Sequence, residues 1–107
     1  MSVGITLIAK EREEQINKHG RTTELDILNN YEYQLTDAAQ GLLPNYPESM
    51  KGAYIQAQES YPPVGWDAEA WKHIVNKPYL ERLAVAGALI AAEIDRVLAT
   101  ETQPQNG

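Results

Sequence analysis

Two short runs of basic and polar side chains are the part of this chain best suited to bind an anion. One run follows an expected N-terminal helix; the other, which also contains His73, precedes Pro78 and has no acid between Glu69 and Glu81. Lysine offers a phosphate a point charge and arginine a bidentate fork, and the helix start expected at Pro78 attracts anions. The candidate ligand-binding residues are Lys18, His19, Arg21, Thr22, Trp71, Lys72, Asn76, Lys77 and Tyr79.

Within this set we expect Lys18, Arg21, Lys72 and Lys77 to hold phosphates, and Trp71 and Tyr79 to contact a base, because flat rings near cations can stack on nucleobases. The alternative is that the cations are ordinary residues at helix C-termini, where positive charge is favourable.

A second candidate site consists of carboxylates near the two ends of the chain. They could hold Mg²⁺ between facing helices, since this cation prefers oxygen ligands and often binds together with substrate phosphates. The residues are Glu13, Glu14, Glu93 and Asp95. Glu93 and Asp95 are two positions apart, however, so they point to different sides of a helix. The alternative is that these two acids pair with Arg96 or Arg12.

The element expected to organise these groups is a helix from Pro78 to Leu98. Proline is tolerated in the first turn of a helix, and no charged residue occurs between Arg82 and Glu93. An apolar stripe at spacings of three and four consists of Leu80, Leu83, Gly87, Ile90, Ile94 and Val97. The other faces are mostly alanine, and a helix that is apolar all round is buried all round. We therefore expect a central helix enclosed by its own chain and a second copy.

Small residues on this central helix would let another helix approach closely; they are Ala84, Gly87, Ala88 and Ala91. The uncharged segment is too short to cross a bilayer, which takes ~20 apolar residues.

The remaining helices are predicted from caps and stops. Ser2 can cap a helix over residues 3–18 that Gly20 ends, and Arg21 to Asp26 is expected to be a polar connection. A second helix is predicted from Ile27 or Asn30 to Leu43, and a weaker one over residues 48–59. Asp67 can cap a short helix that ends near Asn76, with Trp66 and Trp71 as a hydrophobic staple.

These patterns predict an all-α fold of four to five helices, with one domain over residues 1–99 and a disordered polar tail over residues 100–107. The chain has 107 residues, no cysteine, and 15 acidic against 9 basic residues, for a net charge of −6. This charge disfavours binding to duplex nucleic acid. No secretory signal or membrane span is predicted, so we expect a cytoplasmic protein that does not bind a membrane.

Two segments, GITLIAKEREEQINKHGRTTELD and WDAEAWKHIVNKPYLERLAVAGALIAAEIDRVLA, resemble a group of small phage and prophage proteins. More remotely, the layout is similar to that of the all-α nucleoside triphosphate pyrophosphohydrolases of the MazG type. That resemblance implies an oligomer with Mg²⁺ held between an EExxE helix and an ExxD helix. Here Asn17 stands where the last acid of the first motif would be.

The leading hypothesis is a homo-oligomeric, non-catalytic protein without a cofactor that captures a nucleotide or a nucleotide-derived signal. The resemblance implies that the signal could belong to host defence and that the protein acts in the host cytoplasm. The first alternative is a Mg²⁺-dependent pyrophosphohydrolase that uses the four carboxylates. The second is a helical adaptor with no small ligand.

Overall fold

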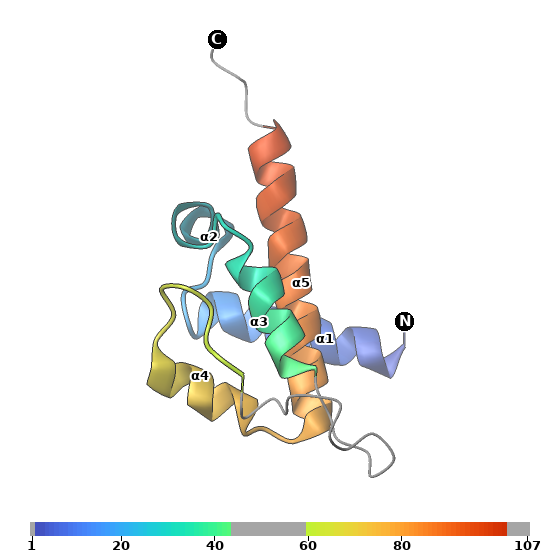
Figure 1. Ribbon diagram of the computed structural model, residues 1–107. Helices are drawn as coiled ribbons and strands as arrows, with labels where there is room; N and C mark the ends of the chain where they lie inside the picture. Colours follow the sequence, from blue (N-terminus) through green and yellow to red (C-terminus); the bar gives the residue numbers. More distant parts are fainter. Residues whose placement is uncertain (1, 44–59, 103–107) are drawn as a thin grey trace.

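The computed structural model describes residues 2–43 and 60–102, and within these residues it contains helices and no strand (Figure 1). The predicted all-α fold is confirmed. The helices in chain order are α1 (Val3–Asn17), α2 (Thr23–Asn29), α3 (Gln34–Leu42), α4 (Ala68–Val75) and α5 (Tyr79–Thr102). The weak helix predicted over residues 48–59 lies outside the described residues.

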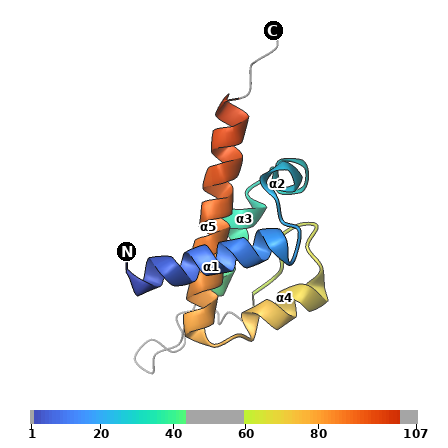
Figure 2. The same cartoon turned by 180° about the vertical axis from the view of Figure 1, so that it is seen from behind.

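Helix α5 is the axis of the fold, with α3 and α1 packed on opposite sides of it (Figures 1 and 2). One face of α5 forms a continuous core with α3 and α4, because small alanines bring the backbones close while leucines fill the space between them. The core comprises Leu35, Ala38, Ala39, Leu42, Trp71, Val75, Val85, Ala86, Leu89 and Ala92.

The small residues of α5 are where another helix approaches, as predicted, and that helix is α1 of the same chain. Ile8 lies so close to Gly87 that a Cβ atom there would be 2.6 Å from Ile8 Cδ1. The side chains of Ala84 and Ala91 beside this crossing are half-buried. The close approach of α1 to α5 therefore favours glycine at position 87, because a larger residue there would displace the Ile8 side chain.

Helix α5 is not buried on every side within the single chain, and its enclosure by a second copy stays a prediction. Its buried side chains gather on the face toward α3, whereas Leu80, Leu83, Ile90 and Ile94 are 65%, 36%, 46% and 54% exposed. The chain contributes α1, α2 and α3 to pack against α5, and within the described residues these helices leave most of the predicted apolar stripe in contact with solvent.

The predicted starts of α1 and α4 are confirmed by their caps. Ser2 Oγ accepts a hydrogen bond from the Ile5 amide at 3.1 Å, and an Asp67 carboxylate oxygen accepts one from the Ala70 amide at 2.8 Å. The Trp66 and Trp71 rings meet edge to face with centroids 6.1 Å apart, as a hydrophobic staple requires.

The region between α1 and α3 differs from its prediction. Thr22 caps α2, so most of the predicted polar connection is helical. The predicted second helix is interrupted after Asn29, because Tyr33 has a φ of +70° and helix cannot continue through that conformation. At the other end of the chain α5 continues to Thr102, so residues 100–102 are helical rather than part of a tail.

Candidate functional site

The two predicted basic runs meet at one cavity of about 320 Å³ between α1, α4 and α5. Figure 2 shows the C-terminal end of α1 and helix α4 on the same side of α5. Three predicted ligand-binding residues, His19, Arg21 and Lys77, line this cavity together with His73. The complete lining is Glu11, Gln15, His19, Arg21, Ala70, His73, Ile74, Lys77, Val85 and Leu89.

The turn after α1 places His19 and Arg21 at the rim of the cavity. Gly20 reverses the chain with a φ of +66°, a conformation that glycine adopts without steric cost. The Arg21 amide then donates to the Gln15 carbonyl at 2.8 Å, and Arg12 Nη1 donates to the Arg21 carbonyl at 3.2 Å. The backbone of Arg21 is thus fixed on both sides.

The junction between α4 and α5 places Lys77 in the lining of the same cavity. The Lys77 amide donates to the Ile74 carbonyl at 3.1 Å. The buried Arg82 side chain donates from Nε to the Lys77 carbonyl at 3.1 Å and from Nη1 to the Leu42 carbonyl at 2.8 Å. Arg82 therefore holds the backbone beside Lys77 against the end of α3.

Among the four arginines of the chain, Arg21 is the one available for a ligand. Arg12 pairs with Asp95 at 3.2 Å, Arg96 with Glu93 at 2.6 Å, and Arg82 donates to two backbone carbonyls. Within residues 2–43 and 60–102, the Arg21 guanidinium makes no hydrogen bond or ion pair. It lies 4.7 Å from the centroid of the Trp66 ring.

Partial burial lowers the pKa of Arg21 by desolvating its charge, although arginine stays protonated at physiological pH. A cation that has lost part of its hydration gains more from an anionic partner than one surrounded by water. The position of Arg21 therefore suits it to bind a phosphate or a carboxylate.

The floor of the cavity is apolar apart from one amide. Val85 and Leu89 of the core form part of it beside the half-buried Ile74. Gln15 is 5% exposed, and its Oε1 is buried without a hydrogen-bond partner in the described part of the chain. A buried acceptor without a donor is costly, so this oxygen would gain from a hydrogen bond if the Gln15 side chain turned toward a ligand in the cavity.

The other predicted ligand-binding residues lie elsewhere. Trp71 is 3% exposed in the core, where its indole Nε1 donates to the Ser60 carbonyl at 3.2 Å, so its ring cannot stack on a base. Thr22 is used as the cap of α2. Four others are not part of the cavity lining: Lys18, Lys72, Asn76 and Tyr79. Of these, Tyr79 carries the Arg82 guanidinium over its ring at 5.2 Å.

The candidate metal ligands are separated or already paired. Glu93 accepts two hydrogen bonds from Arg96, at 2.6 and 3.0 Å, and Asp95 accepts one from Arg12. The alternative interpretation of these two acids, pairing with Arg96 and Arg12, is therefore confirmed. Glu13 and Glu14 do not join them: no group of three or more metal-binding side chains gathers anywhere in residues 2–43 and 60–102.

A buried polar chain lies behind Arg21, next to a second hollow of about 340 Å³ that shares His19, Arg21 and Ala70 with the cavity. Trp66 Nε1 donates to Asn30 Oδ1 at 2.8 Å, and Asn30 Nδ2 donates to Asp26 Oδ1 at 2.8 Å. Asp26 is 2% exposed, and burial raises its pKa despite the opposing effects of Asn30 and of the nearby arginines.

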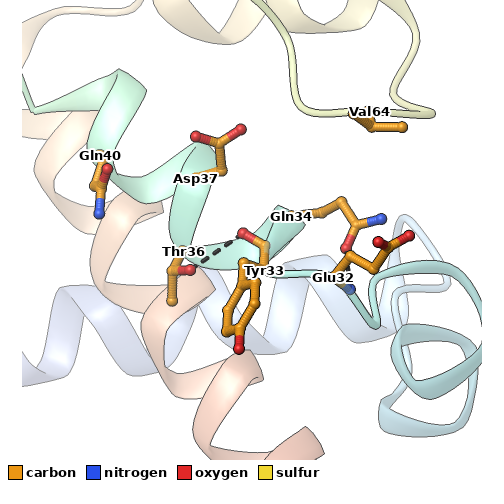
Figure 3. A pocket seen from close by; sticks show the side chains of 7 residues that line it. All are labelled: Glu32, Tyr33, Gln34, Thr36, Asp37, Gln40 and Val64. Atoms are coloured by element: carbon orange, nitrogen blue, oxygen red, sulfur yellow. Dashed lines mark hydrogen bonds between the residues drawn. The ribbon is translucent and has the colours of Figure 1, made fainter.

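A different hollow, of about 400 Å³, lies at the N-terminal end of α3 (Figure 3). Its charged lining residues, Glu32 and Asp37, are both acids, and Val64 faces them from the segment before α4. The Gln34 side chain is already occupied, because its Oε1 accepts from the Glu32 amide at 2.6 Å. This hollow has the wrong charge for the ligand that the sequence predicts.

Three polar residues of the lining, His73, Glu11 and Gln15, were not among the predicted ligand-binding residues. His73 was in the second basic run, one turn of helix from Lys77. Glu11 and Gln15 are four positions apart, which places them on one face of α1, and that face ends at His19. The spacing of four positions between Glu11, Gln15 and His19 is the signal in the sequence from which their common surface could have been predicted.

Comparisons with family models, curated proteins and solved structures found no match. The resemblance of the two terminal segments to phage proteins and to MazG-type enzymes therefore stays a prediction. Within the described residues, no helix combines the length and the apolar character needed to cross a membrane.

Proposed function

We propose that this chain is a non-catalytic binding protein for a small phosphate-bearing ligand of the nucleotide class, held in the cavity between α1, α4 and α5. The observation that supports this proposal is the meeting of Arg21 and Lys77, 56 positions apart in the sequence, in the lining of one cavity. Neither side chain makes a hydrogen bond or a salt bridge within residues 2–43 and 60–102, although Asp26 lies near enough to Arg21 to stabilise its charge.

The charge of the cavity contrasts with that of the whole chain. The protein carries a net charge of −6 with histidine counted as neutral, yet on the same count the lining has two cations, Arg21 and Lys77, against one acid, Glu11. Arg21 offers several donors in a plane and Lys77 offers a point charge, a combination that suits phosphate oxygens. His19 and His73 add further donors at the rim.

The apolar floor and the Gln15 amide suit the remainder of a nucleotide. Ligand pockets are mostly apolar with a few placed polar groups, and span ~300–1,000 Å³. A cavity of about 320 Å³ is at the lower end of this range, which favours a mononucleotide over a larger ligand. Ile74 and Leu89 would contact the face of a ring, and Gln15 Oε1 would accept a hydrogen bond from the base or the sugar.

Capture is favoured over hydrolysis because the acids that would hold Mg²⁺ are engaged by arginines. To bind a metal, Glu93 and Asp95 would have to give up Arg96 and Arg12, and Arg12 also anchors the Arg21 carbonyl. A nucleotide-derived signal, such as the host defence signal that the resemblance to phage proteins implies, belongs to the proposed ligand class.

Isothermal titration calorimetry with a panel of nucleotides, with and without Mg²⁺, tests the proposal. We expect binding of at least one nucleotide, little effect of Mg²⁺ on its affinity, and no turnover. Absence of heat with every nucleotide in the panel would contradict the proposal. Pyrophosphate release that Glu93→Gln abolishes would contradict it in favour of the enzyme alternative.

Two lysines on neighbouring elements provide a matched pair of variants. Lys77→Met removes a charge from the cavity lining, whereas Lys72→Met removes one from an exposed position outside it. A hydrogen bond to a charged group is worth ~1.5–3 kcal/mol, so we expect Lys77→Met to weaken nucleotide binding at least about tenfold. Lys72→Met should leave the affinity unchanged, and equal losses in the two variants would remove Lys77 from the site.

A further inference from the structure

The side of α5 that carries no partner in the described chain is a strip of large aliphatic side chains. We define the apolar stripe by its exposed members Leu80, Leu83, Ile90 and Ile94, which are between 36% and 65% exposed. No charged residue occurs between Arg82 and Glu93, and alanines flank the stripe. In Figure 1 the C-terminal part of α5 projects beyond α1 and α3. Contiguous apolar surface of this kind marks an interaction site.

We propose that the apolar stripe is the contact surface between two copies of this chain, with their α5 helices antiparallel about a two-fold axis. The stripe fits this partner because it is self-complementary: its exposed members are all aliphatic, and their spacings of three, seven and four positions place them on one side of α5. Such spacing lets two helices interlock side chains along a shared seam, and a two-fold axis applies the same patch twice.

The positions of the large side chains set the register of the two helices. Pairing Leu83 of one copy with Ile94 of the other also brings Leu80 level with Val97. It places Ile90 opposite Gly87, where it would meet Ile8 of α1, because Ile8 covers Gly87 within the same chain. Large aliphatic residues thus meet along the whole length of the pair. Shifting one helix by seven residues toward its own N-terminus would instead put Leu83 opposite the exposed Glu101.

Charge at the ends of α5 selects the antiparallel orientation. In this register Glu101 of one copy approaches the first turn of α5 in the other copy, where the helix dipole is positive. A parallel pair would place the two Glu101 carboxylates side by side, and like charges at such short range repel. The N-terminal half of α1 extends past α5 (Figures 1 and 2) and adds exposed apolar side chains, Val3 at 76% and Ile5 at 54%.

Light scattering coupled to size-exclusion chromatography measures the mass of the full chain in solution. We expect a dimer, and we expect Ile90→Lys and Ile94→Lys each to convert it to a monomer with unchanged helical circular dichroism. Leu28→Lys is the matched control, because Leu28 is 69% exposed on α2, away from the stripe, and it should remain dimeric. A wild-type monomer at every concentration, or a control that dissociates equally, would overturn the proposal.

Cysteine cross-linking tests the orientation independently, and the chain contains no natural cysteine to interfere. Leu83→Cys and Ile94→Cys are made as separate variants. Positions 83 and 94 are about 16 Å apart along one helix, at 1.5 Å per residue. The antiparallel register therefore predicts a disulfide between the two variants when they are mixed and none within either variant alone. Cross-linking of each variant with itself, but not of the mixture, would show a parallel pair and overturn the register.

The proposal of a dimer and the proposal of a ligand site can be contradicted independently of each other. None of the four stripe residues lines the cavity between α1, α4 and α5, so the monomeric Ile90→Lys variant should keep its nucleotide affinity. A dimer that binds no nucleotide would contradict the proposed function alone, and a nucleotide-binding monomer would contradict the dimer alone.

Discussion

The crossing of α1 and α5 gives a quantitative test of the packing that supports the cavity. In Gly87→Ala the new Cβ atom would lie 2.6 Å from Ile8 Cδ1, 2.7 Å from Cγ1 and 3.3 Å from Cγ2. Carbon atoms pack best at ~3.5–4.0 Å, so Ile8 must retreat by about 1 Å. Overpacking of this kind costs ~1–3 kcal/mol, while alanine gains ~1 kcal/mol over glycine in a helix. The expected net loss in the free energy of unfolding is therefore up to ~2 kcal/mol.

The sign of the Gly87→Ala effect should reverse when Ile8 is truncated. Ile8→Ala removes all three atoms that the new Cβ would meet, so in that background Gly87→Ala should stabilise the protein by ~1 kcal/mol through helix propensity alone. Urea denaturation of the four proteins at one chain concentration gives the coupling energy, expected to be ~1–3 kcal/mol. Gly4→Ala is the control, since its Cβ would meet only Ser2 Oγ at 3.8 Å. A coupling energy near zero would refute the close crossing.

Two further predictions concern single residues. Burial raises the pKa of Asp26, so its contribution to stability is complete below its ordinary pKa and is lost as the pH rises through the raised value. Asp26→Asn should therefore be more stable than wild type in urea at pH 7, with the difference shrinking toward pH 4; a variant less stable at pH 7 would contradict this. Tyr33 has a φ of +70°, so Tyr33→Gly should raise the free energy of unfolding by ~0.5–1 kcal/mol. Tyr31→Gly, which lacks that backbone conformation, should not raise it, and equal effects at the two positions would contradict the strain.

The sequence predicted the helix starts well because each has a local chemical cause. Ser2 and Asp67 act as caps through their own side-chain oxygens. Pro78 directly precedes α5, because the fixed φ of proline suits the start of a helix. The break between α2 and α3 was missed because Tyr33 adopts a positive φ, which sequence patterns assign to glycine or asparagine. Hydrogen bonds of its neighbours surround this turn, from the Glu32 amide to Gln34 Oε1 at 2.6 Å and from Thr36 Oγ1 to the Tyr33 carbonyl at 3.1 Å, but these residue types do not by themselves signal a positive φ.

The burial of α5 could be predicted only in part, because an apolar helix shows that a face needs a partner but not where the partner comes from. The alanine and glycine face is covered by α1 of the same chain, whereas Leu83 and Ile90 remain exposed.

Only part of the candidate site could be predicted, because the sequence shows which residues can bind a ligand but not which of them come together. His19, Arg21 and Lys77 could be recognised as cations in acid-free runs, but their meeting around Gln15 depends on how α1 crosses α5. Trp71 was assigned to the ligand, and its position as the second ring of the staple places it in the core instead.

The most direct test of the central claim is a nuclear magnetic resonance titration of the isotope-labelled chain with the nucleotide that binds most tightly in calorimetry. Our account predicts that the amide shifts change most at Gln15, at residues 19–21, at residues 73–77 and at Val85. Changes centred on the acidic hollow at the start of α3, or along the apolar stripe of α5, would contradict the assignment of the cavity as the ligand site.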